Sequence, residues 1–238
     1  MWGILYRKGE LKMDANKRKI RELQVERTIK ALTKNNMEAH YIPSMEALLP
    51  KVRTLLKPKE KIGVGGSASL AETGVLDLLR SGEYTFLDRH EKGLSSEEVN
   101  QLLMESFTAD TYLASANAVT EHGELYCVDG NSNRVAAMLY GPKQVILVVS
   151  WDKIVPDLEA AAVRVKQTAA PANAVRLNCD THCATHGKCL NPTVSDTNLM
   201  ALGAGACEHT ICSNYVIFSH QKFPQRIKVL LVGESFGY

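Results

Sequence analysis

Residues 61–70 read Lys-Ile-Gly-Val-Gly-Gly-Ser-Ala-Ser-Leu, a short apolar run that leads into a glycine-rich turn. The run over residues 61–65 predicts a short buried strand, and the apolar spacing over residues 70–80 predicts a helix directly behind the turn. A strand joined to a helix in this way is the repeating unit of α/β proteins. This stretch therefore predicts the fold class, and its neighbours extend the pattern.

Strands and helices alternate along most of the chain on both sides of this unit. Helices are predicted over residues 20–32, 45–56, 95–107, 133–139 and 156–167, with a kink or late start at Pro50 and a capping box of Ser95 and Glu98. Strands are predicted over residues 39–42, 84–87, 111–115, 124–128, 144–149, 215–219 and 227–232. We therefore expect an α/β domain with a mostly parallel sheet flanked by helices.

Composition excludes several classes of protein. The chain has 238 residues, of which 45% are hydrophobic and 23% are charged, as in ordinary globular proteins. Its 28 basic and 26 acidic residues give a formal charge of +2, so we expect no nucleic-acid partner. The longest apolar run, residues 145–149, is too short to span a membrane, and the apolar N-terminal stretch is too short for a signal peptide. We expect a cytoplasmic protein with an extension over residues 1–14 and one domain over residues 15–238.

The glycine-rich turn is a candidate anion-binding site. Backbone N–H groups of such a turn can point at one spot, and nearby serine hydroxyls add hydrogen-bond donors. The candidate ligand-binding residues here are Gly65, Gly66, Ser67 and Ser69. The turn lacks the third glycine of a dinucleotide fingerprint and the lysine of a P-loop, so we expect neither NAD nor ATP. The alternative is an ordinary strand-to-helix turn capped by Ser69.

A second polar group flanks the strand predicted over residues 124–128. Arg134 could hold a carboxylate or phosphate with two hydrogen bonds, and Asn117 and Asn133 are further candidate ligand-binding residues. Glu121 and Asp129 are the candidate catalytic carboxylates, with Glu121 as a general base or a nucleophile. In the alternative interpretation these are solvated turn residues and Arg134 forms a structural ion pair. A similar loop ion pair is the preferred interpretation of Asp-Arg-His at residues 88–90.

Together these segments resemble one protein family, the lactate-utilisation (LUD) domain family. The resemblance is carried by residues 62–70, Asn-Ala-Val-Thr at 117–120, Val-Asp-Gly-Asn-Ser-Asn-Arg-Val-Ala-Ala at 128–137, the stretch 141–149 and Lys-Ile-Val at 153–155, within a similarity that covers roughly residues 15–235. It implies a fold like that of ribose-5-phosphate isomerases and CoA transferases, with a cleft for phosphate- or carboxylate-bearing ligands. It also implies a part in oxidising L-lactate to pyruvate, alongside iron–sulfur partner proteins.

Residues 120–123, Thr-Glu-His-Gly, also resemble the Ser-Glu-Asn-Gly of some CoA transferases, in which the glutamate accepts an acyl group. Thr and His replace Ser and Asn here. The short match implies an acyl-accepting role for Glu121 only if the protein is itself a transferase.

Six cysteines are present, and five of them lie between Cys179 and Cys212. Residues 179–213 lack periodicity and predict a long Cys-rich loop, which resembles the insert found before the last strands of many stand-alone LUD proteins. Four convergent thiolates bind zinc or an iron–sulfur cluster. The candidate ligands are Cys183, Cys189, Cys207 and Cys212, with Cys179 and His182 in reserve. The alternative is a set of free or reversibly oxidised thiols, and Cys127 is expected to be a buried structural residue.

Three functions are compatible with these features. The preferred hypothesis is a protein of organic-acid metabolism that binds an anionic small molecule at the turn and a metal or iron–sulfur centre at the cysteines, which would make it an oxidoreductase subunit. The second hypothesis is a non-catalytic subunit of an oxidase complex with structural zinc. The third is a CoA transferase or sugar-phosphate isomerase that depends on Glu121. A homodimer is compatible with each of them.

Overall fold

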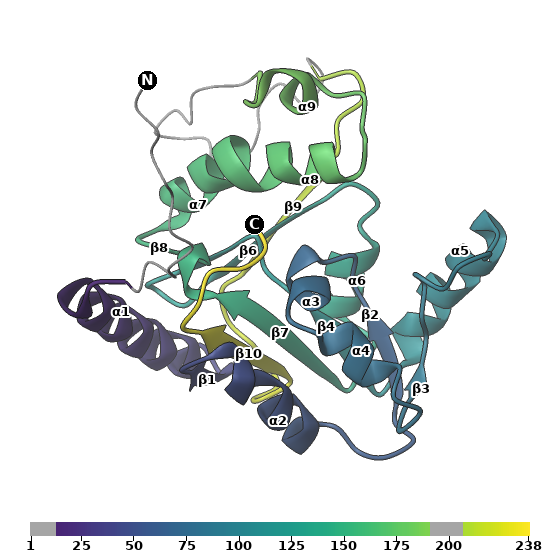
Figure 1. Cartoon of the computed structure of the whole chain (residues 1–238), viewed down its shortest axis with the longest axis horizontal. Coiled ribbons are helices and arrows are strands. Elements are labelled where there is room, and N and C mark those ends of the chain that lie inside the picture. Colours follow the sequence, from purple (N-terminus) through teal and green to yellow (C-terminus); the bar gives the residue numbers. More distant parts are fainter. Residues whose placement is uncertain (1–12, 191–206) are drawn as a thin grey trace, which may run out of the picture.

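The computed structural model describes residues 13–190 and 207–238. Its centre is a parallel sheet of six strands (Figure 1). In spatial order these are β1 (Glu38–Ile42), β10 (Ile227–Val232), β7 (Gln144–Ser150), β4 (Thr111–Ala114), β2 (Lys61–Val64) and β3 (Thr85–Phe86). The predicted α/β class and parallel sheet are therefore confirmed. The extension predicted over residues 1–14 lies almost wholly outside the described residues.

Helices cover both faces of this sheet because successive side chains of each strand point to opposite sides. Ile146 and Val148 of β7 belong to the core on one face, which is covered by α2 (Met45–Leu55), α3 (Ala68–Glu72) and α4 (Val75–Leu79). Val145, Leu147 and Val149 belong to the core on the other face, which is covered by α1 (Ala15–Lys34) and α6 (Asn133–Leu139). The long continuous apolar run of β7 is thus buried on both sides, as its composition predicts.

A second sheet of four strands packs beside the first and is not predicted by the sequence. Its order is β8 (Ile154–Val155), β5 (Ala118–Thr120), β6 (Leu125–Asp129) and β9 (Asn214–Phe218), and β6 runs antiparallel to both of its neighbours. The side of this sheet away from the main core packs on α7 (Leu158–Arg164) and the π-helical turn Val165–Ala169. That turn leads directly into α8 (Ala170–Arg176). Strands of two or three residues are too short to show a period of two, so the sequence gives no signal for β5 and β8.

The structure corrects or refines three local predictions. The helix expected over residues 70–80 is divided into α3 and α4 at Gly74, whose φ of +72° lies in the left-handed region that glycine adopts readily. Pro50 lies inside α2, so the late start expected for that helix is wrong, while the kink stays a prediction. The predicted Cys-rich loop lies partly outside the described residues, and its described part contains one short helix, α9 (His182–His186), which Thr181 caps. The capping box of Ser95 and Glu98 at the start of α5 (Ser96–Glu105) is confirmed.

The remaining described helices are short. They are the 3-10 turns Ser106–Thr108, before β4, and Trp151–Lys153, between β7 and β8. Among residues 13–190 and 207–238, no helix combines the length and the apolar composition needed to cross a bilayer.

Candidate functional site

A cavity of about 250 Å³ opens at the carboxyl ends of the parallel strands. The turn after β2, the segment after β4 and the 3-10 turn after β7 all reach it, and α8 closes it from the side. In α/β proteins with an open parallel sheet, ligands bind in the crevice outside the carboxyl ends of the strands. The parallel topology therefore brings segments far apart in sequence to one site.

Most of the predicted ligand-binding residues line this cavity. They are Gly66, Ser67, Ser69, Asn117, Asn133 and Arg134, together with the candidate catalytic residue Asp129. Gly65 lies behind the lining, where a Cβ would stand only 3.1 Å from the Arg134 Cγ. The sequence motifs thus converge on one place in the fold.

The two serines of the turn have different roles. Ser67 caps α3, since its hydroxyl accepts a hydrogen bond from the Leu70 amide at 3.3 Å. Ser69, which the ordinary-turn alternative named as the cap, lies one turn further on and is buried. Because α3 has only five residues, a charged side chain has to supply most of the attraction for an anion.

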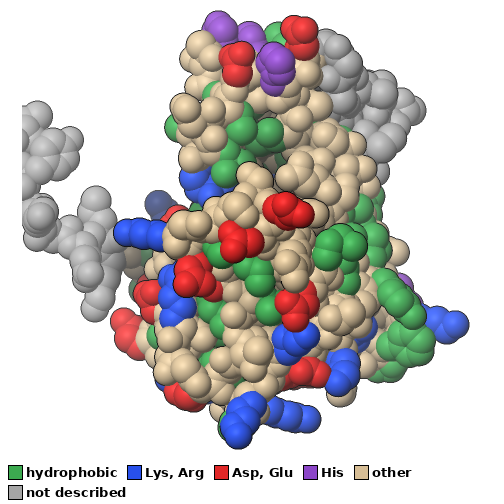
Figure 2. Space-filling model, turned by 90° about the vertical axis from the view of Figure 1, so that its right-hand side faces the viewer, with side chains coloured by type: hydrophobic (Ala, Val, Ile, Leu, Met, Phe, Trp, Pro, Cys, Tyr) green, Lys and Arg blue, Asp and Glu red, His purple; other side chains and the backbone are tan. Residues whose placement is uncertain are grey.

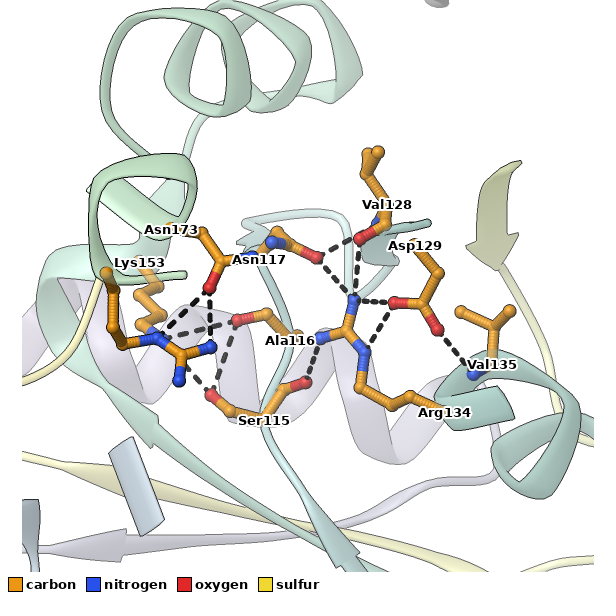
Figure 3. A network of polar contacts seen from close by, with 10 residues as sticks. Ser115, Ala116, Asn117, Val128, Asp129, Arg134, Val135, Lys153 and Asn173 are labelled. Atoms are coloured by element: carbon orange, nitrogen blue, oxygen red, sulfur yellow. Dashed lines mark hydrogen bonds and ion pairs between the residues drawn. The ribbon is translucent and has the colours of Figure 1, made fainter. Parts of the chain in front are cut away.

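That charged group is Lys153, which the sequence showed only as part of the Lys-Ile-Val motif. Its side chain is 2% exposed, and its Nζ donates to Ser69 Oγ at 2.9 Å, to Ser115 Oγ at 3.2 Å and to the Ala116 carbonyl at 3.5 Å (Figure 3). Burial, followed by the positive charges of Arg164 and Arg134, lowers the pKa of Lys153 from 10.5 to about 7. The hydrogen-bond partners that the structure describes for this ammonium are thus all neutral.

Arg134 is bonded to the protein rather than free for a ligand. Its Nε donates to Asp129 Oδ1 at 2.8 Å, and its other nitrogens donate to the Ser115 carbonyl at 2.7 Å, Asn117 Oδ1 at 2.8 Å and the Val128 carbonyl at 3.0 Å (Figure 3). This is the geometry of the structural ion pair that the alternative interpretation described. Arg134 therefore lines the cavity while its charge is balanced by Asp129.

Three further basic residues line the cavity: Arg89, His90 and Arg176. The Arg89 Nε is buried and has no hydrogen-bond partner among the described residues, whereas Asp88 pairs with Arg80 at 2.7 Å. Arg176 donates to the neutral Asn173 Oδ1 at 2.7 Å. Burial and then the charge of Arg89 lower the pKa of His90. Since Asp129 is the one acid in the lining that the structure describes, the cavity is positively charged.

Glu121 does not join this group. It follows β5 and accepts hydrogen bonds from Gln24 Nε2 and Arg27 Nε of α1, both at 2.9 Å. It is absent from the described lining of the cavity. The carboxylate therefore fastens α1 to the second sheet, and its position gives no support to an acyl-accepting role.

The candidate metal ligands surround a second, smaller cavity of about 40 Å³. All four thiols, Cys183, Cys189, Cys207 and Cys212, line it, and so does His182. Burial, followed by the thiols of Cys189 and Cys183, raises the pKa of Cys212 to about 12, so these side chains lie close together. Within the described ranges, no three His, Cys, Asp or Glu side chains already form a metal-ligand group. Cys127 is buried in β6, as expected.

Comparison with known proteins places the chain in a family. The model of the LUD domain matches residues 25–232, which is most of the sequence. A solved structure, a DUF162 family protein from Deinococcus radiodurans, is similar at 17% identity with a TM-score of 0.46, over 90% of this chain and 98% of the other. No curated protein matches the chain significantly. With its family motifs gathered at the edge of a parallel sheet, the chain belongs to the LUD domain family.

Proposed function

We propose that this is a cytoplasmic, lactate-utilisation-type protein of organic-acid metabolism that binds a small carboxylate in the 250 Å³ cavity. Membership of the LUD family supports the metabolic role. The charge and size of the cavity support the class of ligand.

The observation that carries this proposal is the set of basic side chains without acidic partners. Among the described residues, Lys153, Arg89 and Arg176 form no ion pair, although all three line the cavity. Burying an unpaired charge costs free energy, which an anion in the cavity offsets. Lys153 is buried and Arg176 is exposed, so the charges extend from the interior of the cavity to its mouth.

The size and the hydroxyl groups fit a small 2-hydroxy acid. Ligand cavities for drug-sized molecules begin at about 300 Å³, so 250 Å³ suits a smaller molecule. A carboxylate would face the guanidinium of Arg89 and the ammonium of Lys153. The Ser69 and Ser115 hydroxyls accept hydrogen bonds from Lys153. Each also has an O–H donor and a second lone pair, with which it can bond to a ligand hydroxyl.

Oxidation of a 2-hydroxy acid to a 2-oxo acid releases two electrons and two protons. We propose that an iron–sulfur oxidoreductase partner accepts the electrons, as the family role implies, and that this chain binds and presents the acid. In this arrangement the chain's own residues provide binding and orientation.

Calorimetric titration of the full chain with L-lactate, pyruvate and inorganic phosphate tests the proposal. We expect one carboxylate per chain, and we expect Arg89→Gln to weaken its binding at least about tenfold, the cost of one charge-assisted hydrogen bond. Arg53→Gln is the matched control, because Arg53 pairs with Glu83 at the surface and lies outside the cavity lining. Absence of carboxylate binding to the wild type, or binding of phosphate alone, would overturn the proposal.

A further inference from the structure

The cysteine cavity is separate from the anion-binding cavity. Of the described residues that line each cavity, only Ile211 is shared. Cys183 belongs to α9, Cys189 follows it, and Cys207 and Cys212 precede β9. Figure 1 places α9 at the end of the molecule beyond α8, and Figure 2 shows histidine side chains at the surface of this end, above apolar ones. Two chain segments therefore bring four thiols around one small space.

A buried lysine lines the same cavity. Lys166 is 6% exposed, and its Nζ has no hydrogen-bond partner among the described residues. It lies on the π-helical turn Val165–Ala169, a local distortion of a kind that is frequent at functional sites. An unpaired ammonium in the interior is unfavourable unless a negative group balances it. None of the described side chains that line this cavity is an aspartate or a glutamate.

We propose that this cavity binds a single Zn²⁺ ion through the thiolates of Cys183, Cys189, Cys207 and Cys212, with Lys166 as the counter-charge. Zinc prefers tetrahedral sulfur ligands, and the ion with four thiolates carries a net negative charge. That charge gives the Lys166 ammonium an electrostatic partner, which the residues that the structure describes do not supply.

The size of the cavity favours one ion. A volume of about 40 Å³ is the space of a few water molecules, which is enough to hold a single ion. The thiols are not yet arranged as a ligand group, so binding must draw them together. It must also deprotonate them, which releases protons to the solvent.

The first experiment uses the full chain, reduced and purified without oxygen and without an affinity-metal step. We expect one zinc per chain by elemental analysis. After removal of the metal, titration with Co²⁺ should give the sulfur-to-cobalt charge-transfer bands and the visible bands of a tetrahedral tetrathiolate site. Zn²⁺ should then displace the cobalt, and a calorimetric titration in buffers of different ionisation enthalpy should detect proton release.

Variants distinguish the ligands from their neighbours. Cys207→Ser and Cys212→Ser should each abolish the tetrathiolate spectrum. Cys179→Ser is the matched control from the same stretch, because Cys179 does not line the cavity, and it should retain one metal per chain. Lys166→Met should keep the stoichiometry but weaken zinc binding about 10–100-fold, as loss of outer-shell partners of metal ligands does.

Each contrary result overturns a defined part of the proposal. A wild-type chain that binds neither Zn²⁺ nor Co²⁺ contradicts the site, and iron recovered with sulfide contradicts a single zinc ion. Loss of binding in Cys179→Ser contradicts the assignment of ligands. Unchanged affinity in Lys166→Met contradicts the counter-charge. The zinc stoichiometry and the cobalt titration of the wild-type chain test the site even if a variant fails to fold.

Discussion

The Lys153 ammonium lies 2.9 Å from the Ser69 hydroxyl, although 84 residues separate them in the sequence. Ser69 follows β2 and Lys153 follows β7, and only β4 lies between these strands in the sheet. Because all three strands are parallel, the segments that follow them emerge at the same edge. The fold thus places a buried amine beside the glycine-rich turn, and the amine changes the expected response of the protein to pH.

We expect the free energy of unfolding to rise between pH 7 and pH 9 because of Lys153. Its folded pKa, about 7, lies below the ordinary value of 10.5, so the unfolded chain binds more protons over this range. Lys153→Met removes the titrating group, and the rise should be smaller in the variant. Denaturant unfolding of both proteins at the two pH values measures the difference, and equal rises would contradict the lowered pKa.

Carboxylate binding should weaken as the pH rises above about 7. An anion favours the charged form of Lys153, whose pKa lies near that value in the free protein, so binding should be accompanied by proton uptake. Titrations with L-lactate at pH 6.5 and pH 8.5 measure the change. Affinity that is the same at both values would show that Lys153 does not contact the ligand.

Arg134→Ala should destabilise the protein by about 3–5 kcal/mol, because it leaves Asp129 as a buried, unpaired carboxylate. The two side chains are only 12% and 9% exposed. Arg53→Ala, which removes an ion pair whose side chains are 47% and 48% exposed, should cost at most about 1 kcal/mol. Denaturant unfolding measures both. If Arg134→Ala lost little free energy of unfolding, the structural ion pair would be contradicted, and Arg134 would again be a candidate ligand-binding residue.

Glu121→Ala should leave carboxylate affinity within about twofold of the wild type, a difference too small for a lost charged contact. The residue bonds to α1 and is absent from the cavity lining that the structure describes. Its partner Arg27 is largely exposed, so the loss of stability should also be about 1 kcal/mol or less. Abolished binding in a folded variant would support the transferase hypothesis instead.

Local signals in the sequence were sufficient to predict the parallel sheet. They were also sufficient to predict the glycine-rich turn and the polar group around Arg134, which line the same cavity. The apolar run of β7, the capping box at Ser95 and the glycine-rich turn each depend on residues close together in the chain. Strand–helix alternation then predicts that the turns share one edge of the sheet. Strands, helix caps and turns of this kind can be predicted from composition and spacing.

The basic side chains of the cavity could not be predicted in the same way. Lys153 lies in a short turn whose sequence does not indicate burial, and only its contacts with Ser69 of α3 and with Ser115, which follows β4, show that it is buried. Arg176 and Arg89 meet at the cavity because α8 lies over the end of the sheet, which depends on the unpredicted second sheet. Sequence spacing leaves two interpretations of Arg134 open, because it does not show how many acceptors surround a guanidinium.

The position of β10 has a consequence for how the molecule is made. This strand lies between β1 and β7, and it pairs Lys228 with Glu38 and with Ile146. During synthesis, the backbone N–H and C=O groups of β1 and β7 that pair with β10 therefore stay unpaired until residues 227–232 have been made. Such long-range pairing slows folding and exposes apolar edges to other chains. Nascent or shortened chains that lack β10 should consequently depend on chaperones, while the finished sheet closes in its last step.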